Sequence, residues 1–123
     1  IATGADRARI RHDAVESTVR FVDAFPAHEH AAVVLRAAVE DMYDMQEFER
    51  AVVYGHRLID EYPASNADIQ RAAWTVIAHA SFDLADYQPA ESAYLQVLAM
   101  MPADDEARPD LVDNLAASIY TPG

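Results

Sequence analysis

Residues 74–102 read WTVIAHASFDLADYQPAESAYLQVLAMMP, and this stretch decides the fold. Its apolar residues recur at intervals of three and four, which is typical of amphipathic helices rather than of strands. A weak break lies at residues 85–89, and Pro102 ends the stretch because proline lacks the amide hydrogen that a helix needs. The stretch therefore predicts two consecutive helices that form a hairpin.

The same pattern occurs once more, one interval earlier in the chain. One constant shift of the sequence on itself superposes apolar and proline positions: Leu35 on Trp74, Ala38 on Ile77, Val39 on Ala78, Phe48 on Tyr87, Ala51 on Ala90, Leu58 on Val97 and Pro63 on Pro102. A fixed period in this range is typical of stacked helical hairpins, none of which covers its apolar face alone. The register extends to Ala14 and Pro26 on one side and to residues 112–119 on the other.

We therefore expect an all-α chain of six helices, at residues 6–25, 29–44, 47–62, 66–84, 88–101 and 107–120. They belong to a single domain, 1–123, with repeat units of about 6–28, 29–65, 66–104 and 105–123. The first helix is the second half of a hairpin and the last is a first half, so we expect a piece of a larger protein. In the packed hairpins we expect large rings to surround small alanines: Trp74, Tyr87 and Tyr94 around Ala51, Ala78 and Ala90.

The residues Trp74-x2-Ile77-Ala78, Tyr87, Ala90-x3-Tyr94 and Pro102 together resemble the signature of the tetratricopeptide repeat. The resemblance implies a right-handed superhelical array of antiparallel helix pairs, an α-solenoid. The sequence departs from that family because Gly55 and Ser81 stand where large rings are usual, and because its period is longer than the family's usual one. HEAT-like and other helical-hairpin arrays are the nearest alternatives.

One turn indicates which class of tetratricopeptide proteins the chain resembles. Tyr62-Pro63-Ala64-Ser65, echoed by Phe25-Pro26-Ala27, is similar to the junctions of tetratricopeptide proteins in bacterial envelope assembly and division complexes. The similarity implies a bacterial protein of the periplasm, the cell envelope or the cytoplasm, without deciding among these locations.

The composition excludes several functions. The chain carries 21 carboxylates against nine basic residues, all of them arginine, for a formal net charge of −12. A field of this sign repels nucleic acids and anionic lipid surfaces, so we expect no nucleic-acid partner. No apolar run approaches the ~20 residues of a spanning helix, which predicts no membrane insertion. Without cysteine, thiol catalysis and disulfides are excluded.

No motif indicates catalysis or a cofactor. His28 and His30 would need a third ligand to hold a metal ion, so we expect no metal site. The run Asp104-Asp105-Glu106 fits the start of the last helix, with an aspartate as its N-cap. Glycine-rich phosphate loops and nucleophile elbows are absent from the sequence. We therefore expect a protein that is not an enzyme.

The resemblance implies a concave groove lined by the first helices of successive hairpins. The groove candidates are Arg36, Glu40, Tyr43, Asp44, Thr75, His79, Phe82, Asp83, Asp113, Asn114 and Tyr120. Tyr43, Phe82 and Tyr120 occupy equivalent positions, which predicts a row of aromatic anchors with an acidic rim; packing of these rings inside the array is an equal alternative. The lysines of a carboxylate clamp are missing from this face.

The function predicted from the sequence is a non-catalytic scaffold that binds a protein or peptide, basic or apolar in character, in this groove. An accessory or structural domain of a larger enzyme or envelope assembly factor is an alternative. A third hypothesis is self-association into a homo-oligomer through the exposed terminal helices.

Overall fold

The computed structural model describes residues 3–121, so residues 1–2 and 122–123 of the expected domain lie outside the described part. Six helices are present: α1 Gly4–Ala24, α2 Ala31–Asp44, α3 Phe48–Glu61, α4 Ala67–Asp83, α5 Tyr87–Met100 and α6 Arg108–Tyr120. The prediction of an all-α chain of six helices is confirmed, and every predicted helix end lies close to the observed one.

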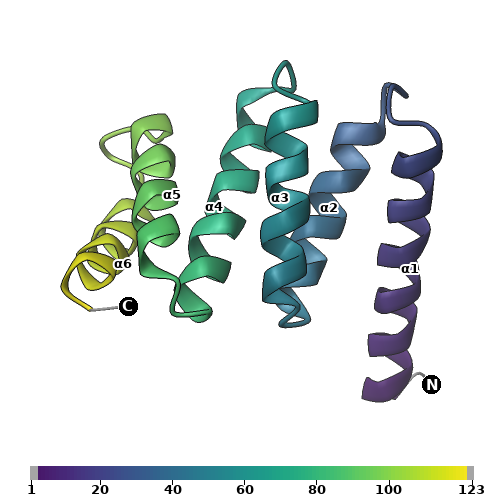
Figure 1. Ribbon diagram of the computed structural model, residues 1–123, viewed down its shortest axis with the longest axis horizontal. Helices are drawn as coiled ribbons and strands as arrows, with labels where there is room; N and C mark the ends of the chain where they lie inside the picture. The colour runs from purple at the N-terminus through teal and green to yellow at the C-terminus, as the bar shows by residue number, and fades with distance from the viewer. Residues whose placement is uncertain (1–2, 122–123) are drawn as a thin grey trace.

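The helices stand side by side in chain order and alternate in direction, with the two termini at opposite ends of the row (Figure 1). Each helix packs against the next in the sequence, and α2 also packs directly against α4. The hydrophobic core runs through the row in two clusters, one centred on α1 to α4 and one on α4 to α6. Consecutive elements thus pack as antiparallel neighbours.

Helix starts follow local capping chemistry, with one correction. Thr3 and Asp6 form a reciprocal capping box at the start of α1, and the Asn66 side chain accepts from the Ile69 amide at the start of α4. The expected aspartate N-cap of α6 is wrong, because α6 begins after Ala107, which makes no side-chain cap. Asp105 instead accepts from the Ala107 amide at 2.9 Å, within the turn that precedes the helix.

The two hairpins close through the same turn. Gln46 and Ala85, which the internal repeat superposes, both adopt left-handed backbone angles, with φ of 63° and 58°. At the end of α2 the Gln46 and Glu47 amides donate to the carbonyls of residues 43 and 42, which is a Schellman motif. The end of α4 repeats the motif at residues 85 and 86, so the internal repeat extends to backbone geometry.

The central hairpins pack small residues against large ones. Tyr94, Ala51, Ala78 and Ala90 are fully buried, whereas Trp74 and Tyr87 are only half-buried. Gly55 occupies the position that corresponds to Tyr94 in the following hairpin, and a methyl group there would approach Ile77 Cγ1 to 2.8 Å. The glycine therefore lets α3 approach α4 closely.

Glycine at either turn should stabilise the fold, because an L-residue in the left-handed region costs about 1 kcal/mol that glycine avoids. We expect Gln46→Gly and Ala85→Gly each to raise the free energy of unfolding by about that amount in urea denaturation. The matched control is Ala14→Gly in the exposed middle of α1, which should lower stability by about 1 kcal/mol. A loss of stability in Ala85→Gly similar to that of Ala14→Gly would contradict the role of the turn.

Candidate functional site

A polar cleft of about 420 Å³ lies between α2 and α4. It is lined by residues from both helices: Arg36, Glu40, Asp68, Arg71, Ala72, Thr75 and Val76. Three predicted groove residues, Arg36, Glu40 and Thr75, therefore lie in one surface depression. Helices α2 and α4 are the first helices of successive hairpins, and they pack directly against one another. The depression is lined by residues of both helices.

The cleft presents charges on both of its walls. On the α2 wall Arg36 Nε lies 3.3 Å from Glu40 Oε1, and on the α4 wall Arg71 lies 3.5 Å from Asp68 Oδ1. Each pair joins residues three or four positions apart on one helix, and no ion pair crosses the cleft among the described residues. Exposed pairs of this kind contribute little to stability, so these groups can exchange their partners for those of a ligand.

Further along the same helices, α2 and α4 are joined by a hydrogen bond. The Tyr43 hydroxyl donates to Asp83 Oδ2 at 2.7 Å, and the Tyr43 ring lies 6.1 Å from that of His79. Burial, followed by the bond to Asp83, raises the pKa of Tyr43 far above its usual range. Asp44 is engaged by Arg11 of α1 at 2.8 Å, so it is tied to the neighbouring helix.

A second group of polar residues, which we call the polar centre, consists of His79 of α4, Tyr94 of α5 and Asn114 of α6. His79 Nδ1 lies 2.8 Å from the hydroxyl of Tyr94, whose side chain is fully buried. Burial raises the pKa of Tyr94 to about 12, and a hydrogen bond from Asn114 opposes that rise. The Tyr94 hydroxyl and His79 Nδ1 form one hydrogen bond, in which the tautomer of the imidazole decides which group donates.

Burial lowers the pKa of His79, and the carboxylate of Asp83 opposes this effect only in part. A neutral imidazole satisfies the Tyr94 hydroxyl through Nδ1 in either tautomer. The centre is therefore built for a neutral His79. It has the character of a satisfied structural network and not of an acid–base pair open to a substrate.

The three aromatic candidates lie in different surroundings. Tyr43 packs on Phe48 across the α2–α3 hairpin, with ring centroids 5.4 Å apart. Phe82 makes the equivalent contact with Tyr87 across the α4–α5 hairpin at 5.6 Å. Tyr120 is 85% exposed at the end of α6. The first two rings thus contribute to packing within hairpins, and only Tyr120 is free on the surface.

The remaining candidates are distributed between these features. His79, Asp83 and Asn114 join the networks around Tyr43 and Tyr94, whereas Asp113 is exposed on α6 away from the cleft. Asp68 and Arg71 of the cleft and Tyr94 of the polar centre were not among the groove residues predicted from the sequence. Arg71 stands one helical turn before Thr75, and its backbone carbonyl accepts from the Thr75 hydroxyl at 2.7 Å. Residues four positions apart lie on the same face of a helix, so the prediction of Thr75 as a groove residue could have been extended to Arg71.

Comparison with known proteins assigns no relative. No protein-family model, curated protein or solved structure matches the chain at a significant level. Among residues 3–121 no group of three or more histidine and acidic side chains is arranged to hold a metal ion. None of the helices that the structure describes has the length and apolar character needed to cross a membrane.

The depressed pKa of His79 predicts acid sensitivity. The unfolded chain binds the imidazole proton at a higher pH than the folded chain does, so stability is present above the unfolded pKa of about 6.5 and falls as the pH drops below it. We expect the urea midpoint to fall from pH 7.5 to pH 5.5, and His79→Gln to flatten that dependence, since glutamine does not titrate. The control His12→Gln, on the exposed face of α1, should retain the parental slope. An unchanged slope in His79→Gln would refute the assignment.

Proposed function

We propose that the protein is a non-catalytic scaffold of tetratricopeptide type that binds a peptide segment of another protein in the cleft between α2 and α4. The observation that carries the proposal is the cleft itself, whose walls come from equivalent helices of two successive hairpins. Its arginines and carboxylates have no partner across the cleft among the described residues. A peptide backbone and charged side chains can occupy that space.

The fold assignment within this proposal rests on three supports. The internal repeat includes matched left-handed turns at Gln46 and Ala85. The first helices α2 and α4 pack on one another while each also packs on its own second helix. Small Ala78 and Ala90 are buried beside Tyr94, as the repeat signature requires. A right-handed superhelical α-solenoid is the array that we propose for these hairpins.

The net charge of the chain favours a basic ligand. The cleft itself is balanced, because its two arginines lie beside Glu40 and Asp68, and Asp44 and Asp83 further along the same helices are engaged by Arg11 and Tyr43. The formal net charge of the whole chain, these groups included, is −12. Attraction of this kind accelerates encounter and discriminates against acidic partners, and it weakens as salt screens exposed charges. We therefore propose a segment that carries arginine or lysine beside apolar residues.

A displayed library of short random peptides, selected against the protein, tests this proposal. We expect the selected peptides to be enriched in Arg, Lys and apolar residues, and their affinity to fall at least about tenfold between roughly 50 mM and 500 mM NaCl. The blocking variant is Ala72→Trp, because Ala72 lies in the cleft and a large ring there fills it without replacing a core residue. We expect this variant to lose the selected peptides.

The matched control is Ala99→Trp, which places the same ring on the exposed face of α5. It should bind like the parent protein, and both variants should retain the parental helical circular dichroism. Equal binding by Ala72→Trp and the parent would place the ligand elsewhere. Variants of Tyr43 or Phe82 would not test peptide binding, because those rings pack within hairpins and their loss would disturb the fold.

A further inference from the structure

Helices α2 and α4 run in the same direction and keep the register of the internal repeat. Both are first helices of their hairpins, and the helices alternate in direction along the row (Figure 1). The repeat makes Tyr43 equivalent to Phe82, and the Tyr43 hydroxyl reaches Asp83, the next residue of α4, at 2.7 Å. Equivalent residues of α2 and α4 therefore lie at nearly the same level along the cleft between them.

This register places the four charges of the cleft in the order negative, positive, positive, negative. On α4 Asp68 comes first, and Arg71 follows three residues later. On α2 Arg36 lies at the level of Thr75, which is four residues beyond Arg71. Glu40 follows Arg36 one helical turn later. At the rise of an α-helix the four positions are spaced by about 4.5, 6 and 6 Å and span about 16.5 Å.

The surface between these charges offers a ligand no further charge. Ala72 and Val76 line the cleft beside the arginines, and the Thr75 hydroxyl already donates to the Arg71 carbonyl at 2.7 Å. Each arginine is paired only with a carboxylate of its own helix, at 3.3 Å on α2 and 3.5 Å on α4. A ligand that brings the opposite charges in the matching order can replace both pairs and leave no charge unpaired.

On the basis of the proposed function, we propose that the cleft binds an extended segment whose cleft-facing residues are, in order, basic, acidic, acidic and basic. Alternate residues of an extended chain point the same way and lie about 6.6 Å apart. This interval is close to the spacing of the cleft charges, and flexible side chains absorb the difference. The pattern is basic-x-acidic-x-acidic-x-basic, which is the same in both chain directions.

The narrowness of the cleft favours an extended chain over a helix. A volume of about 420 Å³ spread over about 16.5 Å corresponds to a mean cross-section of about 25 Å². An α-helix with its side chains is at least about 10 Å across, whereas neighbouring extended chains need only about 4.8 Å. An extended backbone therefore enters the cleft, and its residues x face solvent, where arginine, lysine or apolar residues suit the acidic chain.

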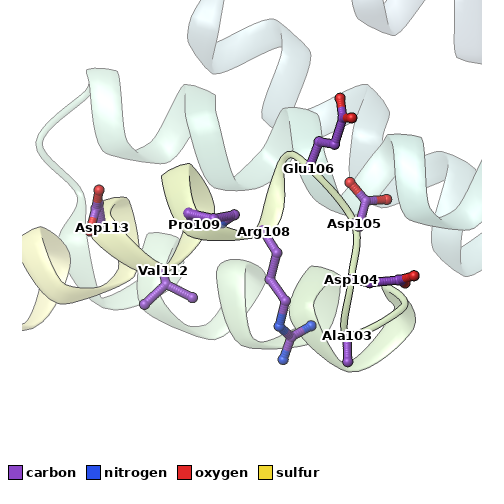
Figure 2. Close-up of a pocket in the computed structure, with 8 residues that line it drawn as sticks. All are labelled: Ala103, Asp104, Asp105, Glu106, Arg108, Pro109, Val112 and Asp113. Atoms are coloured by element: carbon purple, nitrogen blue, oxygen red, sulfur yellow. The ribbon is translucent and has the colours of Figure 1, made fainter.

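The hollow at the turn before α6 cannot distinguish such an order, because its free charges have one sign. Its one arginine, Arg108, donates to the Leu98 carbonyl at 3.0 Å and is thereby tied to the end of α5. The other charged residues lie along the turn and the start of α6 (Figure 2), and all are carboxylates: Asp104, Asp105, Glu106 and Asp113. Basic groups are attracted to this hollow in any order, so it provides a control surface.

Two fluorescently labelled heptapeptides with blocked ends test the proposal in polarisation titrations. Lys-Thr-Glu-Val-Glu-Thr-Lys has the matching order, and Glu-Thr-Lys-Val-Lys-Thr-Glu has the same composition and net charge in the inverted order. We expect the first peptide to bind at least about tenfold more tightly at roughly 50 mM NaCl, and the difference to shrink at roughly 500 mM as salt screens the charges. Ala72→Trp should abolish binding of the first peptide.

The decisive measurement exchanges the charges within each pair of the cleft. A fourfold variant, Arg36→Glu/Glu40→Arg/Asp68→Arg/Arg71→Asp, keeps the net charge and both pairs but inverts their order, so we expect it to prefer the second peptide. If this variant unfolds, the exchange on α2 alone replaces it. That exchange makes the cleft alternate in charge, and it should favour Lys-Thr-Glu-Val-Lys-Thr-Glu, or the reverse of that sequence, over both other peptides.

The control Asp104→Asn/Glu106→Gln, in the hollow before α6, should keep the parental preference. Equal affinity of the parent for the two peptides, no binding of either, or an unchanged preference in the exchanged variant would each overturn the charge order. The library selection separates this failure from failure of the proposed function. Selected peptides that Ala72→Trp blocks leave the proposed function standing without the charge order, whereas a selection that yields no such peptides removes both.

Discussion

The close approach of α3 and α5 to α4 is the constraint on which the rest of the structure depends. On one side Gly55 removes the side chain that would collide with Ile77, and on the other Ala78 and Ala90 are buried without residual exposure. Because interiors are packed to crystal-like density, these small residues fix how near the helices can come. Tyr94 is buried in the same core cluster as Ile77 and Ala78 of α4.

Hydrogen bonds between polar side chains fix how the helices are arranged around α4. The Tyr94 hydroxyl is fully enclosed, and a buried hydroxyl without partners is costly. His79 from α4 satisfies it at 2.8 Å, so α4 and α5 share one hydrogen-bonded centre. On the surface, Tyr43 and Asp83 connect α2 to α4 in a comparable way. The helices that carry the proposed binding face are therefore fixed by two polar contacts, His79 with Tyr94 and Tyr43 with Asp83. The arginine pairs of the cleft are exposed and can exchange their partners.

Much of this arrangement could be predicted from residue types and spacing. Proline positions and the three-and-four periodicity located all six helices, and the internal repeat paired Phe48 with Tyr87, both of which pack on the ring of their own first helix. The resemblance to the tetratricopeptide repeat implied that Arg36, Glu40 and Thr75 line one groove, and the cleft contains all three. Arg71 stands one helical turn before Thr75, whereas the place of Asp68 in the cleft depends on the packing of α4 against α2. The aspartate cap expected for α6 was wrong because Asp105 satisfies an earlier amide.

The sequence by itself determined the helices, their order and the repeat, because periodicity, proline and capping act over a few residues of one chain. Only the tertiary structure decided which polar residues meet, since Tyr43 and Asp83 are separated by 40 positions and their contact follows from the distance between two helices. It also decided which apolar residues remain uncovered. Ala14 is exposed although its counterparts Ala51 and Ala90 are buried, because among the described residues no helix packs over that face of α1.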